Sequence, residues 1–382
     1  MQEEHGTSSD TLSVLALNKR CWLHPERGGS EVNLEETLSR LTDRGHTIHL
    51  LAGQFEDGDS KETDRGVHIN RVGPRTSFGQ PWDDLLAYFF VTLYFPIFSF
   101  KYKSDVIYSV NTPLPWFIFT SKPTVAIFHH IALESFFETH PFPLDWIGYL
   151  VQKLGIQLLG DTVAIGVSPS TVETLVRNGH PAPLTVEIRN GINIEDYEAS
   201  VPTETNKILF VGGLETYKGA DRLPEIHSAI SEQMSNDVQL EIIGREGGAS
   251  KVVKKYCQRR SSAHYHGFVS EEKKQELLSD AGILIVPSRI EGWGLAVIEA
   301  NASGTPAVAN AVGGLCASVQ NGRSGYLIQD YNVDEFAKAV ANLLEDNEHR
   351  EAIANQAIEW AHQHSWRKST SKLEDILVQV SK

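Results

Sequence analysis

The chain has 382 residues, of which 41% are hydrophobic, and its 49 acidic residues outnumber its 34 basic ones. This length predicts two domains of about 190 residues each rather than one core. The acidic surplus argues against a nucleic-acid-binding protein, whose surface would be basic. Three cysteines without a C-x-x-C pair predict neither a disulfide framework nor a zinc site, which favours a reducing cytoplasm.

The first secondary-structure unit is a strand, a glycine-rich turn and a helix. The strand is predicted at Leu12–Leu17, the turn at Gly28 and Gly29, and the helix begins with Ser30 as its N-cap and ends before Gly45. The turn lacks the G-x-G-x-x-G spacing of dinucleotide-binding proteins, so a dehydrogenase is disfavoured.

Four more strands are predicted before the middle of the chain, at Thr47–Ala52, Val67–Val72, Asp105–Ser109 and Thr124–Phe128. The last of them runs into His129 and His130. Neighbouring residues of a strand point to opposite faces, so at most one of these histidines is expected to face a cleft. A histidine at the end of a strand is more often structural than catalytic.

The longest apolar stretch is Leu85–Phe100. It is shorter than the ~20 residues that cross a bilayer, and Pro96 is expected to interrupt it, so the sequence predicts no membrane span. A buried core helix is the favoured interpretation. The alternative is contact with a membrane surface, because Trp82 precedes the stretch and Lys101 and Lys103 follow it.

A capping box predicts a helix that starts at Ser170 to Glu173 and ends at Gly179. In the second half of the chain, a strand from Lys207 leads into a glycine turn that contains Gly213 and is followed by Lys218. A glycine turn with a lysine is an arrangement that cradles phosphate.

Two more strands are predicted at Val238–Ile243 and His264–Phe268. His264 and His266 share one face of the latter strand. No third ligand lies at a useful spacing, so no metal site is predicted.

The stretch Pro287–Pro306 is predicted to carry the chemistry. A buried strand at Gly282–Val286 precedes it, Gly304 ends its helix, and a strand at Ala307–Ala309 follows. The loop between strand and helix should therefore open at the carboxyl edge of a parallel sheet, where open α/β sheets bind their ligands.

Two glycines and two glutamates of this stretch are the candidate ligand-binding groups. Gly292 and Gly294 lack the Cβ atoms that would keep a ligand from the backbone, and the free N–H groups at the helix start form an anion site. Glu291 and Glu299 would accept hydrogen bonds from hydroxyl groups on either side of a phosphate. The alternative is that both glutamates are ordinary solvated side chains.

The stretch P-S-R-I-E-G-W-G-L-A-V-I-E-A-N-A-S-G-T-P resembles the donor-site signature of the retaining family 4 glycosyltransferases. The resemblance is strong from Gly191 to Gly325 and looser before it. It implies an α/β protein of the GT-B fold, in which two Rossmann-like doubly wound domains face each other across a cleft and a C-terminal helix crosses back to the first domain. The expected parts are a disordered tail (1–10), an N-terminal acceptor-side domain (11–188), a hinge (189–206), a nucleotide-sugar-binding domain (207–364) and the crossover helix (365–382).

The resemblance also implies roles for individual residues. Glu291 would meet the donor sugar, Glu299 the ribose and Lys218 the diphosphate, while His129 matches the family's sugar-pocket histidine more closely than His130. Catalytic roles are thus expected for His129, Glu291 and Lys218. The expected donor-binding residues are Gly28, Gly29, Gly213, Lys218, Arg245, Glu291, Gly292, Trp293, Gly294, Leu295 and Glu299.

The sequence departs from the family pattern at two positions. Gly213 stands where the family usually has an arginine, so Lys218 must do more, or Arg245 or Arg289 substitutes. Ala317 stands in place of a usual acidic residue.

The function implied is a cytoplasmic, metal-independent, retaining hexosyltransferase without a cofactor. It would move sugar from a nucleotide-diphosphate donor to a glycan, a lipid-linked saccharide or a small molecule. The flanked apolar stretch Leu85–Phe100 adds the expectation of peripheral contact with the cytoplasmic face of a membrane. Two alternatives stay open: a nucleotide-sugar 2-epimerase of the same fold, and a catalytically degenerate nucleotide-sugar binder.

Overall fold

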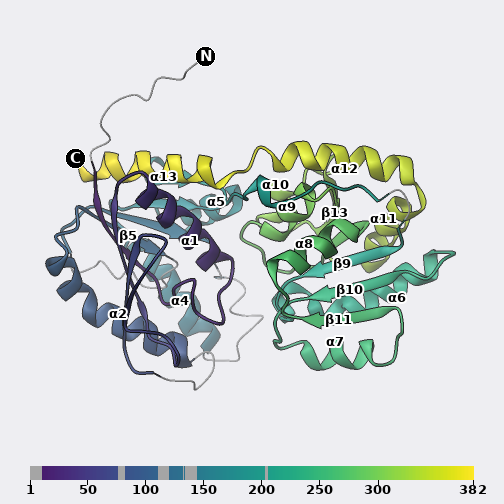
Figure 1. The fold of residues 1–382 in the computed structure, drawn as a ribbon, viewed down its shortest axis with the longest axis horizontal. Helices are drawn as coiled ribbons and strands as arrows, with labels where there is room; N and C mark the ends of the chain where they lie inside the picture. Colours follow the sequence, from purple (N-terminus) through teal and green to yellow (C-terminus); the bar gives the residue numbers. More distant parts are fainter. Residues whose placement is uncertain (1–10, 76–81, 111–119, 132, 134–143, 203–204) are drawn as a thin grey trace, which may run out of the picture. The chain divides into compact units, whose positions relative to one another are not determined.

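The computed structural model describes residues 11–75, 82–110, 120–131, 133, 144–202 and 205–382. The chain forms two compact α/β units (Figure 1). The N-terminal unit comprises Met1–Val167, Val172–Ile188 and Trp366–Lys382, and the C-terminal unit comprises Ser168–Thr171 and Arg189–Ser365. The last helix of the chain therefore belongs to the N-terminal unit.

The N-terminal unit is built on an eight-stranded sheet in the order β3-β4-β2-β1-β5-β6-β7-β8. All neighbours are parallel except β3, which pairs antiparallel with β4. The sequence did not predict β3, because its charged residues show no apolar alternation. The strands are β1 (Ser13–Leu17), β2 (Thr47–Gly53), β3 (Lys61–Asp64), β4 (Val67–Val72), β5 (Val106–Val110), β6 (Thr124–Phe128), β7 (Val163–Gly166) and β8 (Thr185–Glu187).

Helices α1 (Gly29–Asp43) and α13 (Trp366–Ser381) of this unit pack against each other. Glu374 on α13 accepts from Arg44 and lies 2.9 Å from Nε2 of His46, which ties the end of the chain to the turn after α1. Burial disfavours the charge of Glu374, but its bonds to His46 and Arg44 hold the pKa of the carboxyl below its usual value. The C-terminal helix is thus anchored by charge as well as by packing.

Helices α2 (Trp82–Lys101) and α4 (Leu144–Gln157) contribute to one apolar core of the unit together with strand residues such as Leu15 and Leu17. Because residues two apart on a strand share a face, α2 and α4 cover the same side of the sheet. Leu175 of α5 (Pro169–Arg177) also belongs to this core.

The prediction that Leu85–Phe100 forms a buried core helix interrupted by a proline is wrong. The helix is continuous over 20 residues with Pro96 inside it, and only Val91, Phe95 and Ser99 are buried. By length and composition it could cross a bilayer, but one face of it lies in the core of the sheet. The outer face of α2 is exposed and apolar.

Two predicted helix starts are also wrong. Helix α1 begins at Gly29 with Gly28 as its N-cap, and the Glu31 carboxylate fixes this start by accepting from the Gly28 N–H at 2.8 Å. At α5 the side chain of Ser168, rather than that of Ser170, accepts from the backbone N–H of Thr171 at 3.3 Å. A capping serine two residues earlier moves the start of the helix.

The C-terminal unit contains a six-stranded, fully parallel sheet in the order β11-β10-β9-β12-β13-β14. The strand order reverses between β9 and β12, so the carboxyl ends of these two strands form the topological switch point, where doubly wound sheets bind ligands. The strands are β9 (Lys207–Val211), β10 (Gln239–Ile243), β11 (Ala263–Gly267), β12 (Ile283–Val286), β13 (Ala307–Asn310) and β14 (Gly325–Ile328).

Helices cover both faces of this sheet. Ile208 and Phe210 point into one core with α6 and α11, whereas Leu209 between them points into a second core with α8 and α9. The helices of this unit are α6 (Leu223–Gln233), α7 (Ser250–Cys257), α8 (Glu271–Asp280), α9 (Leu295–Ala302), α10 (Leu315–Ser318), α11 (Val333–Glu345) and α12 (Asn347–Ala361).

Candidate functional site

The loops after β9 and β12 pack against each other at the switch point. Gly219 has φ 72°, and a Cβ atom there would lie 2.0 Å from the carbonyl oxygen of Pro287. The N–H of Arg289 donates to the carbonyl of Tyr217 at 2.8 Å. The glycine turn and the signature loop are therefore joined backbone to backbone, which only a glycine at position 219 allows.

This packing brings together two of the predicted catalytic side chains. The ammonium of Lys218 lies 2.7 Å from a carboxylate oxygen of Glu291, and both side chains are largely buried. Burial disfavours the charged lysine, but the Glu291 carboxylate holds the pKa of Lys218 above its usual value. A cation and a carboxylate are thus fixed side by side at the carboxyl edge of the sheet.

The loop after β13 holds the signature loop from the other side. The N–H of Gly314 donates to the carbonyl of Glu291 at 2.8 Å. A Cβ at Gly313 would lie 2.3 Å from the Glu291 carbonyl, and one at Gly314 would lie 2.1 Å from the Gly292 carbonyl. The pair Gly313-Gly314 is required for the close approach that positions Glu291.

Helix α9 follows directly from this loop. Its N-cap is Gly294 with φ 89°, so Leu295 is the first helical residue and its N–H group lies at the helix start, next to the Glu291 loop. Residues with a side chain rarely adopt this backbone conformation, and a Cβ at Gly294 would also lie 2.8 Å from the Leu315 side chain. A glycine in this position is therefore required by the backbone conformation and by the packing around it, and its expected contact with the donor stays a prediction.

Glu299 on α9 is buried and is held by two partners that sequence reasoning missed. Lys274 of α8 donates to it at 3.0 Å, and Tyr197 hydrogen bonds to it. Burial disfavours the charge of Lys274, yet the carboxylates of Glu299 and Glu271 hold the pKa of this lysine well above its usual value. Neither Lys274 nor Tyr197 lies in a recognisable motif, so no signal in the sequence could have identified them.

Trp293 is placed differently from the other residues of the signature loop. It was predicted to bind the donor, but its side chain is 2% exposed. The centres of the Trp293 and His364 rings lie 5.2 Å apart, with the two rings nearly perpendicular. The guanidinium of Arg189 lies 5.4 Å from the centre of the Trp293 ring. The side chain thus packs into the interior of the unit, beside the segments through which the chain enters and leaves it.

The two arginines considered as substitutes at the diphosphate have different surroundings. Arg289 makes two bonds of 2.8 Å to the Asp221 carboxylate. Arg245, after β10, lies 4.2 Å from the ring centre of Phe268, after β11. Arg289 is therefore committed to an ion pair, whereas Arg245 stacks on an exposed aromatic ring at the carboxyl edge.

Gly213 has open space around it. A Cβ at this position would meet only the Glu215 side chain, at 3.8 Å, and its backbone has no positive φ. By contrast, a Cβ at neighbouring Gly244 would lie 1.8 Å from the carbonyl of Gly212. The absence of an arginine at position 213 is not imposed by sterics.

The remaining predicted residues lie in the N-terminal unit. Gly28 and Gly29 form the start of α1, where Glu31 organises the turn by accepting from the Gly28 N–H and from Asn18 at 3.2 Å. His129 follows β6 and is buried, which lowers its pKa to about 3.

The two adjacent histidines differ in exposure: His129 is buried and His130 is exposed. The roles expected for Gly28, Gly29 and His129 stay predictions.

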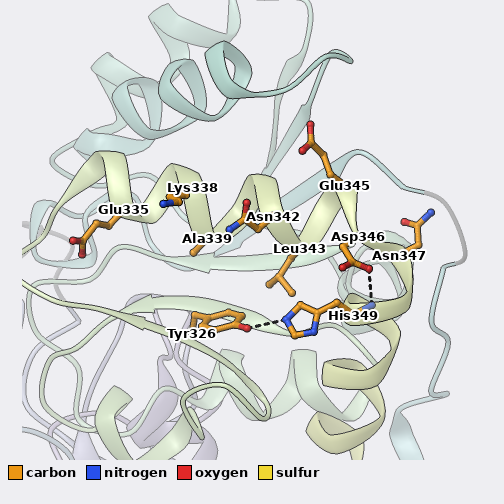
Figure 2. A pocket seen from close by; sticks show the side chains of 10 residues that line it. All are labelled: Tyr326, Glu335, Lys338, Ala339, Asn342, Leu343, Glu345, Asp346, Asn347 and His349. Atoms are coloured by element: carbon orange, nitrogen blue, oxygen red, sulfur yellow. Dashed lines mark hydrogen bonds between the residues drawn. The ribbon is translucent and has the colours of Figure 1, made fainter.

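A surface groove elsewhere in the C-terminal unit contains none of the predicted residues. Figure 2 shows its side chains spread along α11, β14 and the start of α12, with Tyr326 bonded to His349 at 2.8 Å. Its polar groups do not converge on one point, so it is not the candidate site. Within the described residues, no group of three or more His, Cys, Asp or Glu side chains could hold a metal ion.

Comparison with known proteins agrees with this geometry. Residues 27–196 match the model of Glycosyltransferase Family 4, and residues 193–360 match that of Glycosyl transferases group 1. A D-inositol 3-phosphate glycosyltransferase of Corynebacterium diphtheriae is 30% identical over 92% of this chain and 90% of that protein. The enzyme of the same name from Corynebacterium aurimucosum is 34% identical, but over only 47% of this chain and 44% of that protein.

Solved structures show the same fold. Sucrose-phosphate synthase from Thermosynechococcus elongatus matches with a TM-score of 0.81 at 19% identity, over 96% of this chain and 98% of that one. Anabaena Alr3699/HepE in complex with UDP and glucose matches with a TM-score of 0.73 at 20% identity, over 96% and 99%. These likenesses identify the two-domain α/β architecture as the GT-B fold. The chain belongs to the family 4 glycosyltransferases, also described as glycosyl transferases group 1.

Proposed function

We propose that this protein is a retaining glycosyltransferase that transfers a hexose from a nucleotide-diphosphate donor to an acceptor hydroxyl group without a metal ion. The observation that carries the proposal is the contact of Lys218 with Glu291 at the switch point of the C-terminal sheet. This contact supports the proposal, because a lysine can bind phosphate and a neighbouring carboxylate can accept hydrogen bonds from sugar hydroxyls, and a sugar bonded to a diphosphate would need both groups.

In this proposal the negative charge of the departing diphosphate is stabilised by groups of the protein itself. Lys218 supplies a full positive charge. The first N–H groups of α9 carry partial positive charges at the same carboxyl edge of the sheet. Groups already fixed in place stabilise developing charge without a cost of reorganisation.

Glu291 would orient the sugar, and Glu299, held by Lys274, would accept from the ribose hydroxyls. Burial limits Glu299 to few partners, so Lys274 would also fix which of its oxygens the ribose meets.

The names of the relatives guide the choice of substrates. Because the corynebacterial relative is named for D-inositol 3-phosphate and the Anabaena structure was solved with UDP and glucose, UDP-glucose and inositol phosphate head the panel of candidates. The acceptor class proposed is a glycan, a lipid-linked saccharide or a small polyol.

The test is a thermal-shift panel of nucleotide sugars and nucleoside diphosphates, followed by transfer assays with and without EDTA. A ligand at 100 times its Kd stabilises the folded state by about 2.7 kcal/mol, a shift that is easily measured. Release of nucleoside diphosphate that requires an added acceptor and survives EDTA is the expected result. Release without an acceptor would favour an epimerase, and binding without turnover a degenerate binder.

A further inference from the structure

Helix α2 carries an exposed apolar stripe along its whole length. Between Asp84 and Lys101 it contains no charged residue, and its inward side is already occupied by the core. The exposed side chains recur every three or four positions, so they form one continuous stripe along the helix. Its members are Trp82, Leu85, Phe89, Leu93, Ile97 and Phe100, each more than half exposed.

Helix α4 carries a second stripe of the same kind. Ile147, Leu150 and Leu154 are about half exposed and follow one another at helical spacing, with Trp146 beside them. Because α2 and α4 pack on the same core, the two helices that carry these stripes lie on the same side of the N-terminal sheet (Figure 1). Two thirds of the exposed large apolar side chains in the described part of the chain belong to α2, α4 and the turn after α4. Exposed apolar surface of this extent marks a site of interaction.

The charged groups at the borders of the stripes indicate which kind of partner would cover them. Lys101 is the last residue of α2 and Lys103 follows the helix, and the ammonium of Lys101 lies 4.9 Å from the centre of the Tyr102 ring. On α4 the ammonium of Lys153 lies 5.5 Å from the centre of the Tyr149 ring. Lysines and aromatic rings side by side at the border of an apolar surface are typical of segments that lie at the headgroup level of a bilayer.

The acidic residues of the two helices, Asp83, Asp84 and Asp145, lie in their first turns. Asp84 at the start of α2 is paired with Lys19 at 2.7 Å and with Arg20 at 2.5 Å. Burial disfavours its charged form, but these two cations hold the pKa of Asp84 below its usual value, so its charge is already compensated. Lys101, Lys103 and Lys153 are therefore the cations that would meet an anionic headgroup, in a chain whose net charge is −15.

We propose that the stripes of α2 and α4 dock the protein on the surface of a lipid bilayer. One side of α2 is fixed in the core of the sheet, so the helix lies at the boundary of headgroups and acyl chains and does not span it. Trp82 and Trp146, at the starts of the two helices, would sit at the same boundary, as tryptophans do. This inference concerns the N-terminal unit and does not depend on which sugar the C-terminal unit binds.

The test is flotation of the full chain with vesicles of phosphatidylcholine alone or mixed with phosphatidylglycerol. We expect the wild type to float with both and more strongly with the anionic vesicles. Phe89→Glu/Leu93→Glu and Leu150→Glu/Leu154→Glu should each lower the partition coefficient at least tenfold. The matched control is Val176→Glu/Val252→Glu, which adds the same charge at exposed valines of helices α5 and α7. This control variant should float like the wild type.

Two further measurements complete the test. Brominated lipids should quench tryptophan fluorescence in the wild type and much less in Trp82→Phe/Trp146→Phe. Thermal melting and nucleotide binding show that each variant is folded. Failure of the wild type to float, or equal flotation of the stripe and control variants, would overturn the proposal. So would a lipid-free dimer that the stripe substitutions convert to monomer, because the stripes would then be a subunit interface.

Discussion

Lys218 and Glu291 are 73 residues apart in the chain, yet the lysine ammonium donates to the glutamate carboxylate at 2.7 Å. Their loops follow β9 and β12, which are neighbours in the sheet only because the strand order reverses there. The contact joins the residue proposed for the diphosphate to the residue proposed for the sugar. Their substitutions should therefore not act independently.

We predict that Lys218→Ala weakens the binding of free nucleoside diphosphate by about 1.5–3 kcal/mol, the usual worth of a charge-assisted bond. It also leaves the Glu291 carboxylate without its cation, next to an anionic ligand. The double variant Lys218→Ala/Glu291→Gln should therefore bind nucleoside diphosphate better than Lys218→Ala alone. Titration calorimetry on the four proteins of the cycle measures this. Unchanged affinity in Lys218→Ala would refute the assignment of the lysine.

We predict that substitutions of the two signature glutamates, Glu291 and Glu299, change different kinetic constants. Contact with the sugar matters most as the sugar gains positive character, so Glu291→Gln should lower kcat with a smaller change in donor KM. Contact with the ribose is nearly the same before and during reaction. Glu299→Gln should therefore chiefly raise donor KM.

The two glutamate variants should also differ in binding without reaction. Glu299→Gln should weaken free nucleoside diphosphate binding, which Glu291→Gln should not. Steady-state kinetics with varied donor, together with calorimetry, distinguishes the two. Parallel effects of both changes on nucleotide binding would contradict the proposed geometry.

The architecture could be predicted from the sequence because apolar runs and glycine stops recur along the chain. The strands predicted at Val67–Val72 and Thr124–Phe128 have the observed bounds, and Gly304, with φ 84°, ends the signature helix as expected. The short strand β3 was missed since its residues Lys61–Asp64 are all polar and pair only at the sheet edge.

The partners of the site residues could not be predicted, because they come from distant elements. Nothing local links Glu299 to Lys274 or Trp293 to His364. The first contact joins helices α9 and α8, and the second joins the loop before α9 to the segment after α12. The exposure of α2 escaped prediction for a related reason. A helix that is apolar all round is normally buried, and only the tertiary structure shows which of its faces lacks a neighbour.

Burial of His129 predicts a pH-dependent stability. Its pKa is about 3 in the folded protein against 6.5 for an ordinary histidine, so between these values the unfolded chain binds a proton that the folded chain does not. The free energy of unfolding should fall as the pH drops from 6.5 towards 3, with a slope of up to about 1.4 kcal/mol per pH unit from this group.

The variant His129→Gln removes this group and should reduce that slope, whereas His130→Gln, at an exposed neighbour, should not. Urea unfolding at several pH values measures both. Equal slopes in the wild type and His129→Gln would mean that this histidine does not contribute.

The glycine at position 213 allows a gain-of-function test of the diphosphate site. The resemblance to the family pattern implies an arginine at this position, and in this structure a Cβ would meet only Glu215 at 3.8 Å, so a side chain can be added without strain. Gly213→Arg should tighten nucleoside diphosphate binding about tenfold, which corresponds to about 1.4 kcal/mol for one added charge-assisted bond. Gly213→Gln, which adds similar bulk without the charge, should leave the affinity near that of the wild type.

Because Glu215 could pair with the new arginine, Gly213→Arg/Glu215→Gln should bind nucleoside diphosphate at least as tightly as Gly213→Arg. If arginine and glutamine at position 213 have the same effect, the diphosphate does not lie beside the glycine turn, and Lys218 would need another role.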